Sequence, residues 1–229
     1  MAAETLTSAL LWVAAPSFLL GSIPVGLLVG RAFGVGDVRN VGSGNIGATN
    51  VLRAGGKAAG AATLALDVAK GAIPALLAGA WLGPVGAGVA GLAAFLGHCY
   101  SPFLKFDGGK GVASGLGALL AWRPEIALLS VLLFAAVVWR TRYVSLASLA
   151  ASFLAVGVYV LMGSWNRDVA ILAPFVLAMA LVSAWRHRAN IGRLLRGEES
   201  KIGGSAPPQA PGSTGAQDAD APAGDGRAP

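Results

Sequence analysis

Long apolar stretches, separated by short polar and glycine-rich segments, make up most of this 229-residue chain. A helix that crosses a membrane needs about 20 mostly apolar residues, with a range of ~17–25. By this rule the pattern predicts an all-α, polytopic membrane protein with seven transmembrane helices. The predicted spans are Leu6–Val29, Ala58–Ala80, Pro84–Tyr100, Gly111–Trp122, Ile126–Trp139, Val144–Met162 and Val169–Trp185. The fourth and fifth are short, so they tilt, extend into the flanking charged residues or do not reach across.

The basic residues predict how these spans are oriented. With seven spans, one side collects Arg31, Arg39, Arg53, Lys57, Lys105, Lys110, Arg140, Arg142, Arg186, Arg188, Arg193, Arg196 and Lys201. The other side collects Arg123 and Arg167. Because cytoplasmic loops carry the excess of Lys and Arg, the N-terminus is predicted outside and the C-terminus inside. Merging the fourth and fifth segments into one span would remove this asymmetry.

Composition supports a membrane protein over a soluble one. The chain is 55% hydrophobic and 12% charged, with a mean hydropathy of +0.66, whereas a soluble domain has roughly 25% charged residues. The net charge of +6 would suit a soluble nucleic-acid binder, but the apolar runs exclude that reading and no nucleic-acid partner is expected. The single cysteine, Cys99, allows no internal disulfide and is interpreted as a small apolar filler.

The ends of the chain differ in character. No Lys or Arg precedes the first apolar run, so the N-terminal segment lacks the basic region of a cleaved signal peptide and is expected to be a retained span. Residues 1–203 are assigned to the membrane domain, and residues 204–229 to a Pro/Gly/Ala-rich tail that is expected to be disordered. Trp81, Trp122, Trp139, Trp165 and Trp185 fall near predicted helix ends, which favours an interfacial aromatic belt.

A polar segment rich in glycine, Ser43–Arg53, is the first candidate for chemistry. Glycine lets backbone N–H groups approach an anion closely, while Ser43, Asn45, Thr49 and Asn50 supply hydroxyl and amide groups. Arg53 adds a planar charge suited to phosphate or carboxylate. The alternative is a hydrophilic loop whose glycines only turn the chain.

A second segment, Asp107–Gly111, places Lys110 among glycines just before a predicted helix. The N-terminus of a helix offers unpaired N–H groups and the positive end of a dipole, so an anion is favoured there. The spacing of a nucleotide P-loop is absent, because Lys110 is followed by Gly111 and not by Ser or Thr. The alternative is a glycine turn with a lysine that extends to the membrane surface.

A third segment, Arg186–Asn190, is predicted on the same cytoplasmic face. His187 and Asn190 would share one face of a continuing helix, and the arginines around His187 disfavour its protonation. Within the second span, Asp67 and Lys70 are three residues apart, which favours a structural ion pair over direct substrate contact. No ligand pattern suggests a metal or other cofactor.

Other polar residues at helix ends are weaker candidates. His98 ends the third span, where a histidine is more often a cap or a packing residue than a catalyst. Ser145 or Ser148 of the sixth span can present a hydroxyl to the same region, although a serine in a membrane helix often bonds its own backbone.

These motifs resemble those of the acyl-phosphate-dependent glycerol-3-phosphate acyltransferases of bacterial membranes. The resemblance extends from Gly21 to Gly203 and rests on Gly21–Pro24, Ser43–Asn50 with Arg53, Asp67 with Lys70–Gly71, Gly97–His98 through Gly108–Ala113, Thr141–Leu146 and Arg186–Ile191. It implies seven spans, a cytoplasmic C-terminus and a multi-pass protein of the bacterial inner membrane whose active site faces the cytoplasm.

The resemblance further implies an activity in phospholipid synthesis. A fatty acyl group would pass from acyl phosphate to the 1-hydroxyl of sn-glycerol 3-phosphate, giving lysophosphatidic acid and inorganic phosphate, with no cofactor. It implies membrane lipid as surroundings and the acyl-phosphate-producing enzyme as a protein partner. The implied catalytic residues are Ser43, Lys110, His187 and Asn190. The implied substrate-binding residues are Ser43, Gly44, Asn45, Thr49, Asn50, Arg53, His98, Gly108, Gly109, Lys110, Gly111, Ser145, His187 and Asn190.

The role of Asp107, the acceptor of the hydroxyl proton and the function itself each allow more than one interpretation. Asp107 stands where the family more often has a basic or neutral residue, so it either weakens phosphate attraction or pairs with Lys105. We hypothesise that the phosphate of the donor accepts the proton of the acceptor hydroxyl. The alternative is that His187 accepts it. The alternative functions are a transporter of a phosphorylated solute, which would need polar residues on both faces, and a basic lipid-binding scaffold.

Overall fold

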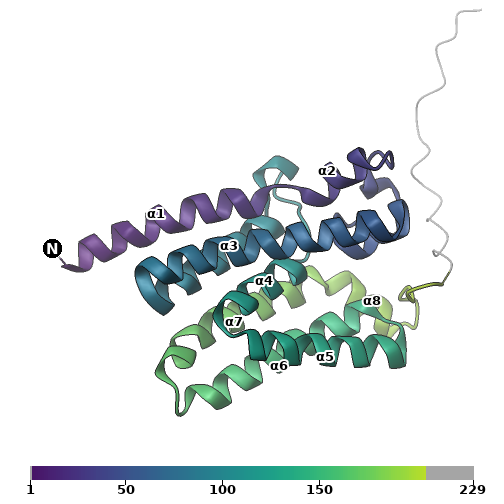
Figure 1. Ribbon diagram of the computed structural model, residues 1–229. Helices are drawn as coiled ribbons and strands as arrows, with labels where there is room; N and C mark the ends of the chain where they lie inside the picture. The colour runs from purple at the N-terminus through teal and green to yellow at the C-terminus, as the bar shows by residue number, and fades with distance from the viewer. Residues whose placement is uncertain (1, 205–229) are drawn as a thin grey trace, which may run out of the picture.

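The computed structural model describes residues 2–204 of the chain, and within them every regular element is a helix (Figure 1). The helices are α1 (Ala2–Ser22), α2 (Val25–Ala32), η1 (Val38–Asn40), α3 (Ala48–Cys99), η2 (Pro102–Leu104), α4 (Val112–Trp122), α5 (Pro124–Thr141), α6 (Val144–Gly163), α7 (Arg167–Arg186) and α8 (Arg188–Leu195). The predicted disordered tail falls almost entirely on residues 205–229, which lie outside the described part.

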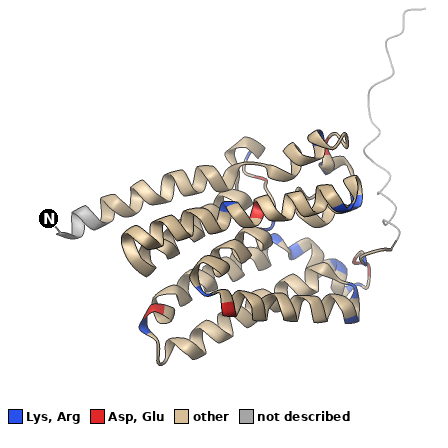
Figure 2. Ribbon diagram, in the orientation of Figure 1, with Lys and Arg blue, Asp and Glu red and all other residues tan. Residues whose placement is uncertain are grey.

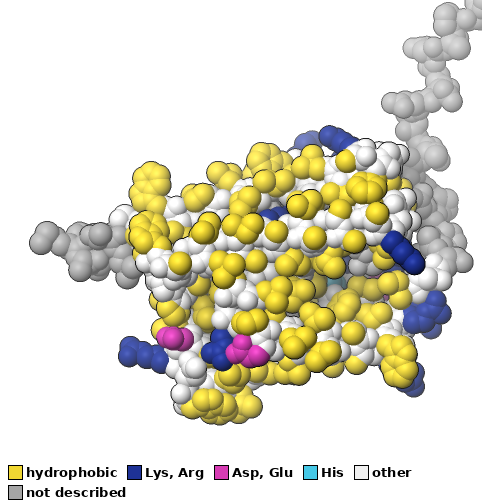
Figure 3. All heavy atoms as spheres, viewed as in Figure 1, with side chains coloured by type: hydrophobic (Ala, Val, Ile, Leu, Met, Phe, Trp, Pro, Cys, Tyr) yellow, Lys and Arg dark blue, Asp and Glu magenta, His cyan; other side chains and the backbone are white. Residues whose placement is uncertain are grey.

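Five helical stretches of the described residues are long and apolar enough to cross a membrane. They are Thr7–Ala32, Ala48–Leu104, Pro124–Thr141, Val144–Gly163 and Arg167–Arg186, and α4 is a shorter apolar helix of 11 residues. Large apolar side chains cover the outward surface of the bundle, as Figure 3 shows for one face. This is the surface expected of a protein whose solvent is lipid.

The long element α3 folds back on itself twice. Gly56 and Gly83 interrupt it with left-handed backbone, at φ values of 79° and 65°, which glycine adopts without a steric penalty. Beyond Gly83 the chain reverses, so that His98 returns to within 3.5 Å of Asp67. The predicted spans Ala58–Ala80 and Pro84–Tyr100 therefore form a helical hairpin within α3.

The first predicted span, Leu6–Val29, corresponds to the apolar stretch Thr7–Ala32, but it is not one continuous helix. It divides between α1 and α2, and Ile23 and Pro24 stand at the break. Proline has no N–H to donate to the preceding turn, and it disfavours helical backbone at the residue before it. At this break the carbonyl of Ile23 accepts hydrogen bonds from the Val25 N–H at 2.9 Å and from Lys70 Nζ at 3.0 Å.

Close backbone contacts hold the bundle together. A Cβ at Gly71 would lie 2.0 Å from the carbonyl oxygen of Ser114, and a Cβ at Gly117 would lie 2.0 Å from that of Val68. Only glycine allows α3 and α4 to approach this closely, as is common where membrane helices pack. In Figure 1, α1 and α3 lie on one side of α4, and α5 and α6 lie on the other.

The core confirms the interpretation of Cys99 and contradicts that of Trp122. Cys99 is fully buried and has no disulfide partner, as expected of a small apolar filler. Trp122 is 9% exposed and packs against Gly91, so its assignment to an interfacial belt is wrong. Trp81, Trp139, Trp165 and Trp185 are exposed, as a belt requires.

Candidate active site

The loop before α3 is held in place by its own amide side chains. Asn50 Oδ1 accepts hydrogen bonds from the backbone N–H of Ser43 at 3.0 Å and from its hydroxyl at 3.3 Å. Asn50 Nδ2 donates to the Val38 carbonyl at 2.7 Å, and Asn45 Oδ1 accepts from the Gly47 N–H at 2.9 Å. The amide of Asn50 is thus engaged in fixing the Ser43 loop.

The segment Asp107–Gly111, called the glycine segment below, does not direct its glycine N–H groups as the sequence led us to expect. The N–H groups of Gly108 and Gly109 donate to the carbonyls of Cys99 and His98, at 3.1 and 3.0 Å, so they do not face an anion. Gly111 caps α4 with a left-handed φ of 79°. In the described part of the chain, the N–H groups of Gly111, Val112 and Ala113 donate to no acceptor. In this segment it is the first turn of α4, and not Gly108 or Gly109, that offers free N–H groups to an anion.

Lys110 links the glycine segment to α8. Its ammonium group donates a hydrogen bond to Asn190 Oδ1, although the two residues are 80 positions apart. Burial lowers the pKa of Lys110 to about 8, and Arg193, Arg186 and Arg53 act in the same direction, against the opposing effect of Glu199. An anion placed beside this ammonium would favour its charged form.

His187 lies between α7 and α8 as a buried, neutral imidazole. Its Nδ1 lies 2.8 Å from the Ser183 carbonyl, which only accepts, so Nδ1 carries the proton and Nε2 the lone pair. Burial, with a further contribution from Lys110, lowers the pKa of His187 to about 4. The helix breaks at His187, so His187 and Asn190 do not lie on one continuous helix as expected.

Glu199 is a site residue that the sequence pattern does not predict. Its Oε1 accepts hydrogen bonds from Asn190 Nδ2 at 2.6 Å and from the Ser145 hydroxyl at 2.7 Å, and its Oε2 accepts from Arg193 Nε at 2.8 Å. Desolvation alone would raise the pKa of Glu199, but these hydrogen bonds outweigh it and lower the pKa. The local sequence carries no signal for this contact, because Glu199 lies in a short polar stretch after α8.

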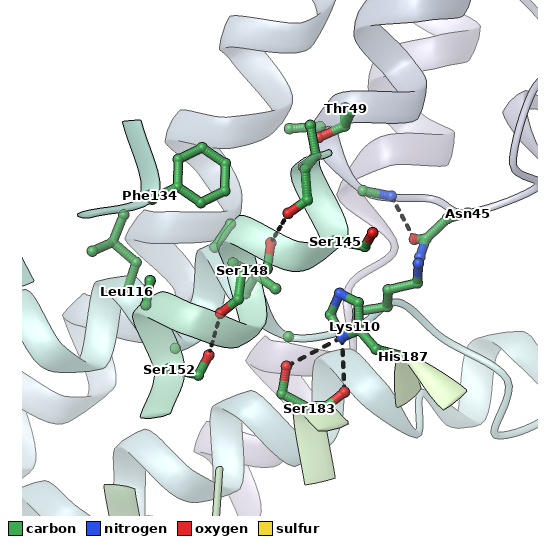
Figure 4. Close-up of a pocket in the computed structure, with 18 of the residues that line it drawn as sticks. Asn45, Thr49, Lys110, Leu116, Phe134, Ser145, Ser148, Ser152, Ser183 and His187 are labelled. Carbon is green, nitrogen blue, oxygen red and sulfur yellow. Dashed lines mark hydrogen bonds between the residues drawn. The ribbon is translucent and has the colours of Figure 1, made fainter. Parts of the chain in front are cut away.

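These groups surround one end of a cavity of about 540 Å³. Figure 4 shows Asn45, Thr49, Lys110, Ser145 and His187 around the same space, with Ser183 beside His187. Of the predicted site residues, Ser43, Asn45, Thr49, Asn50, Arg53, His98, Lys110, Gly111, Ser145, His187 and Asn190 line it, whereas Gly44, Gly108 and Gly109 do not.

The rest of the cavity is mainly apolar and lies between helices. Side chains of α3, α4, α5 and α7 form its wall, among them Leu64, Leu116, Phe134, Val138 and Met179. A polar end and an apolar body together suit a ligand that has a charged head and a hydrocarbon chain.

The spacing of Asp67 and Lys70 predicts an ion pair, and the structure contains it, with Asp67 lining the cavity. Lys70 Nζ lies 2.9 Å from Asp67 Oδ1, and both side chains are buried. Asp67 also lies 3.5 Å from His98 Nδ1, so His98 packs within the bundle. The expected pairing of Asp107 with Lys105 is not found: Asp107 Oδ1 accepts from Arg186 Nη2 at 2.8 Å.

No metal site accompanies this cavity in residues 2–204. No group of three or more His, Cys, Asp or Glu side chains in that range lies together in a way that could hold a metal ion.

Comparison with known proteins identifies relatives along nearly the whole described chain. The model of the family described as glycerol-3-phosphate acyltransferase matches residues 11–197. A glycerol-3-phosphate acyltransferase of Jannaschia sp. (strain CCS1) is 48% identical over 199 residues, covering 86% of this chain and 96% of that protein. One of Halorhodospira halophila is 49% identical over 191 residues, covering 82% and 94%.

Solved structures share the fold. The crystal structure of PlsY (YgiH), an integral membrane glycerol 3-phosphate acyltransferase, superposes in its glycerol 3-phosphate form with a TM-score of 0.78 at 41% identity. The alignment covers 84% of this chain and 94% of that one. The lysophosphatidic acid form of the same protein gives a TM-score of 0.76 at 39% identity.

Proposed function

Because this chain belongs to the glycerol-3-phosphate acyltransferase family, we propose that it transfers a fatty acyl group from acyl phosphate to the 1-hydroxyl of sn-glycerol 3-phosphate. The hydroxyl oxygen forms an ester bond with the acyl carbon, and the bond from that carbon to the phosphate oxygen breaks. The products are lysophosphatidic acid and inorganic phosphate.

The observation that carries the proposal is the meeting of Lys110, His187 and Asn190 at the polar end of an apolar cavity. An acyl phosphate is already activated, so the main tasks are to hold two anionic substrates together and to stabilise the departing phosphate. Cationic and N–H groups at one end, and apolar helix faces beyond them, suit a lipid donor beside a water-soluble acceptor.

We assign the donor phosphate to Lys110, the Ser43 hydroxyl and the free N–H groups at the start of α4. Arg53, His187 and Asn190 would bind glycerol 3-phosphate, and the acyl chain would lie along the apolar wall of α3, α5 and α7. Gly108 and Gly109 act indirectly, since their N–H groups are engaged with the end of α3.

The proton of the attacking hydroxyl is assigned to the departing phosphate, which gains basicity as its bond to the acyl carbon breaks. The competing candidate is Nε2 of the neutral His187. Neither route needs a metal or another cofactor.

We further propose a seven-span topology in a bacterial inner membrane, with the N-terminus outside and the active site facing the cytoplasm. It counts the α3 hairpin as two spans and includes the short α4. Figure 2 shows many Lys and Arg positions gathered at the end of the bundle where α3 begins and α5 ends, which supports this orientation. The acyl-phosphate-producing enzyme remains a proposed partner.

The transporter alternative has less support from the cavity. Arg53, Lys110, Arg193 and Glu199 line its polar end. The charged residues at the opposite helix ends, which are Arg123, Glu125, Arg167 and Asp168, do not line it. A solute that crossed the bundle would need polar groups along its whole route.

The test uses the purified full-length chain in detergent or lipid, supplied with acyl phosphate and glycerol 3-phosphate. We expect phosphate release that requires both substrates, with lysophosphatidic acid detected by mass spectrometry, and loss of both signals in Lys110→Ala. A parallel reaction with acyl coenzyme A as the donor tests donor class. Phosphate release that does not depend on glycerol 3-phosphate, or a Lys110→Ala variant of full activity, would refute the proposal.

A further inference from the structure

Arg186, the last residue of α7, makes three hydrogen bonds to the glycine segment before α4. Its Nε donates to the Gly109 carbonyl at 3.1 Å, and its Nη2 donates to the Gly108 carbonyl at 2.6 Å and to Asp107 Oδ1 at 2.8 Å. The guanidinium carbon also lies 5.7 Å from the centre of the Tyr100 ring. The side chain is 13% exposed, whereas Asp107 is 86% exposed, so the two carbonyls are its better-shielded partners.

The opposite side of the glycine segment is fixed by the end of α3. The N–H groups of Gly108 and Gly109 donate to the carbonyls of Cys99 and His98. The His98 ring packs directly on Gly109, because a Cβ at that position would lie 2.1 Å from His98 Nε2. The segment is therefore held by its N–H groups on one side and by its carbonyls on the other.

The residues on either side of these contacts belong to the proposed reaction. Lys110 directly follows Gly109, and His187 directly follows Arg186. Asn190, whose side-chain oxygen accepts from Lys110, lies one helical turn further along α8. Arg186 itself does not line the cavity. One guanidinium thus joins the two chain segments that carry Lys110 and the His187–Asn190 pair.

We propose that Arg186 is a positioning residue for acyl transfer, which ties the glycine segment to α7 and so keeps Lys110 in place against Asn190 and the donor phosphate. This inference rests on the proposed function. The planar fork of a guanidinium donates in several fixed directions at once, which the point charge of a lysine cannot reproduce. Arg186→Lys is therefore expected to keep the charge but lose the geometry.

The test compares Arg186→Gln and Arg186→Lys with Arg188→Gln in the full-length protein. Arg188 is a matched control: it is exposed, donates to the Trp185 carbonyl at 3.1 Å and stacks on the Trp185 ring. Steady-state kinetics of phosphate release give kcat and KM for each substrate. Hydrogen exchange followed by mass spectrometry reports separately on peptides that cover residues 99–112 and the helices around them.

For Arg186→Gln we expect kcat/KM for acyl phosphate to fall at least about tenfold, the factor that follows from losing roughly one hydrogen bond to a charged group. The KM for acyl phosphate should rise more than the KM for glycerol 3-phosphate. Exchange should quicken in the 99–112 peptide while peptides within α5 and α6 keep wild-type rates. Arg186→Lys should retain the defect in part, and Arg188→Gln should match the wild type.

Equal kinetics and equal exchange for the Arg186→Gln and Arg188→Gln variants would overturn the inference. Uniformly faster exchange across all helices in both Arg186 variants would also overturn it, because that pattern shows a general structural role. An inactive wild-type protein would defeat the proposed function instead, and exchange in the 99–112 peptide would then decide on the positioning role alone.

Discussion

Lys110 donates a hydrogen bond to the side chain of Asn190, a residue 80 positions further along the chain, at the polar end of the cavity. Apolar helices carry the two residues to the same end of the bundle. The geometry makes the charge of Lys110, and the neighbours that tune it, the most direct subject for experiment.

Activity should decline as the pH rises through about 8. Burial lowers the pKa of Lys110 to about 8, so its ammonium loses the proton, and with it the attraction for phosphate, above that value. The dependence of kcat/KM for acyl phosphate on pH, which reports on the free enzyme, measures this limb. Arg has a pKa above 12, so any activity that Lys110→Arg retains should lack the limb. If kcat/KM of the Lys110→Arg variant still fell above about pH 8, the group that titrates would be a residue other than Lys110.

Replacing His187 by Ala separates binding from proton transfer. If the donor phosphate takes the proton, we expect a modest loss of kcat at saturating glycerol 3-phosphate and a raised KM for that substrate. A near-complete loss of kcat with unchanged KM would instead make His187 the base. The pKa of His187, lowered to about 4, keeps the imidazole neutral at the pH of the assay, so its Nε2 accepts and does not donate.

Glu199 should stabilise the site end of the bundle. Glu199→Gln places an amide against the donors of Asn190 and Arg193, and we expect a loss of about 1–3 kcal/mol, the cost of leaving a buried polar group without its partner. A thermal-unfolding assay in detergent measures the lowered Tm. Because hydrogen bonding lowers the folded-state pKa of Glu199, its contribution is present above the ordinary value of about 4.5 and is lost as the pH falls through the folded value.

Two truncations provide a matched comparison for Glu199. A chain that ends at Gly204 retains the Glu199 contacts and the bond from Arg142 to the Ile202 carbonyl, whereas one that ends at Gly197 loses both. We expect the first to keep wild-type Tm and activity and the second to lose both. Equal behaviour of the two chains would show that residues 198–204 do not support the site.

The contact between α3 and α4 should tolerate no added side chain. Gly117→Ala places a Cβ 2.0 Å from the Val68 carbonyl oxygen, and this backbone cannot move away cheaply, so we expect a loss of about 1–3 kcal/mol. At Gly157, in α6, a Cβ would meet nothing within 4 Å, so Gly157→Ala should be neutral or slightly stabilising. Thermal unfolding of the two variants side by side tests the difference.

The apolar pattern predicts most of the helices because their length and composition are local properties. The meeting of Ser43, Lys110 and His187 around one cavity was likewise predictable, since all three lie in polar segments expected at the same side of the membrane. The Asp67–Lys70 pair followed from helical spacing alone.

Other features depend on tertiary contacts that no local pattern contains. The bonds of Glu199 to Ser145 and of Arg186 to Gly109 join residues far apart in the chain, and many partners are possible for each. The N–H groups of Gly108 and Gly109 were expected to face an anion, but the fold of η2 turns them toward the end of α3. Pro24 could have indicated the break in the first span, whereas hydropathy alone does not show it.

The shortness of α4 has a consequence for where chemistry takes place. Eleven residues at 1.5 Å each extend only about 16 Å, roughly half of the ~30 Å hydrocarbon thickness of a bilayer. A helix of this length cannot by itself place Lys110 at one surface of a bilayer and Trp122 at the other. Under the proposed topology and reaction, the soluble acceptor would therefore meet the donor below the membrane surface, and the hydrocarbon tail would change partners without being lifted into water.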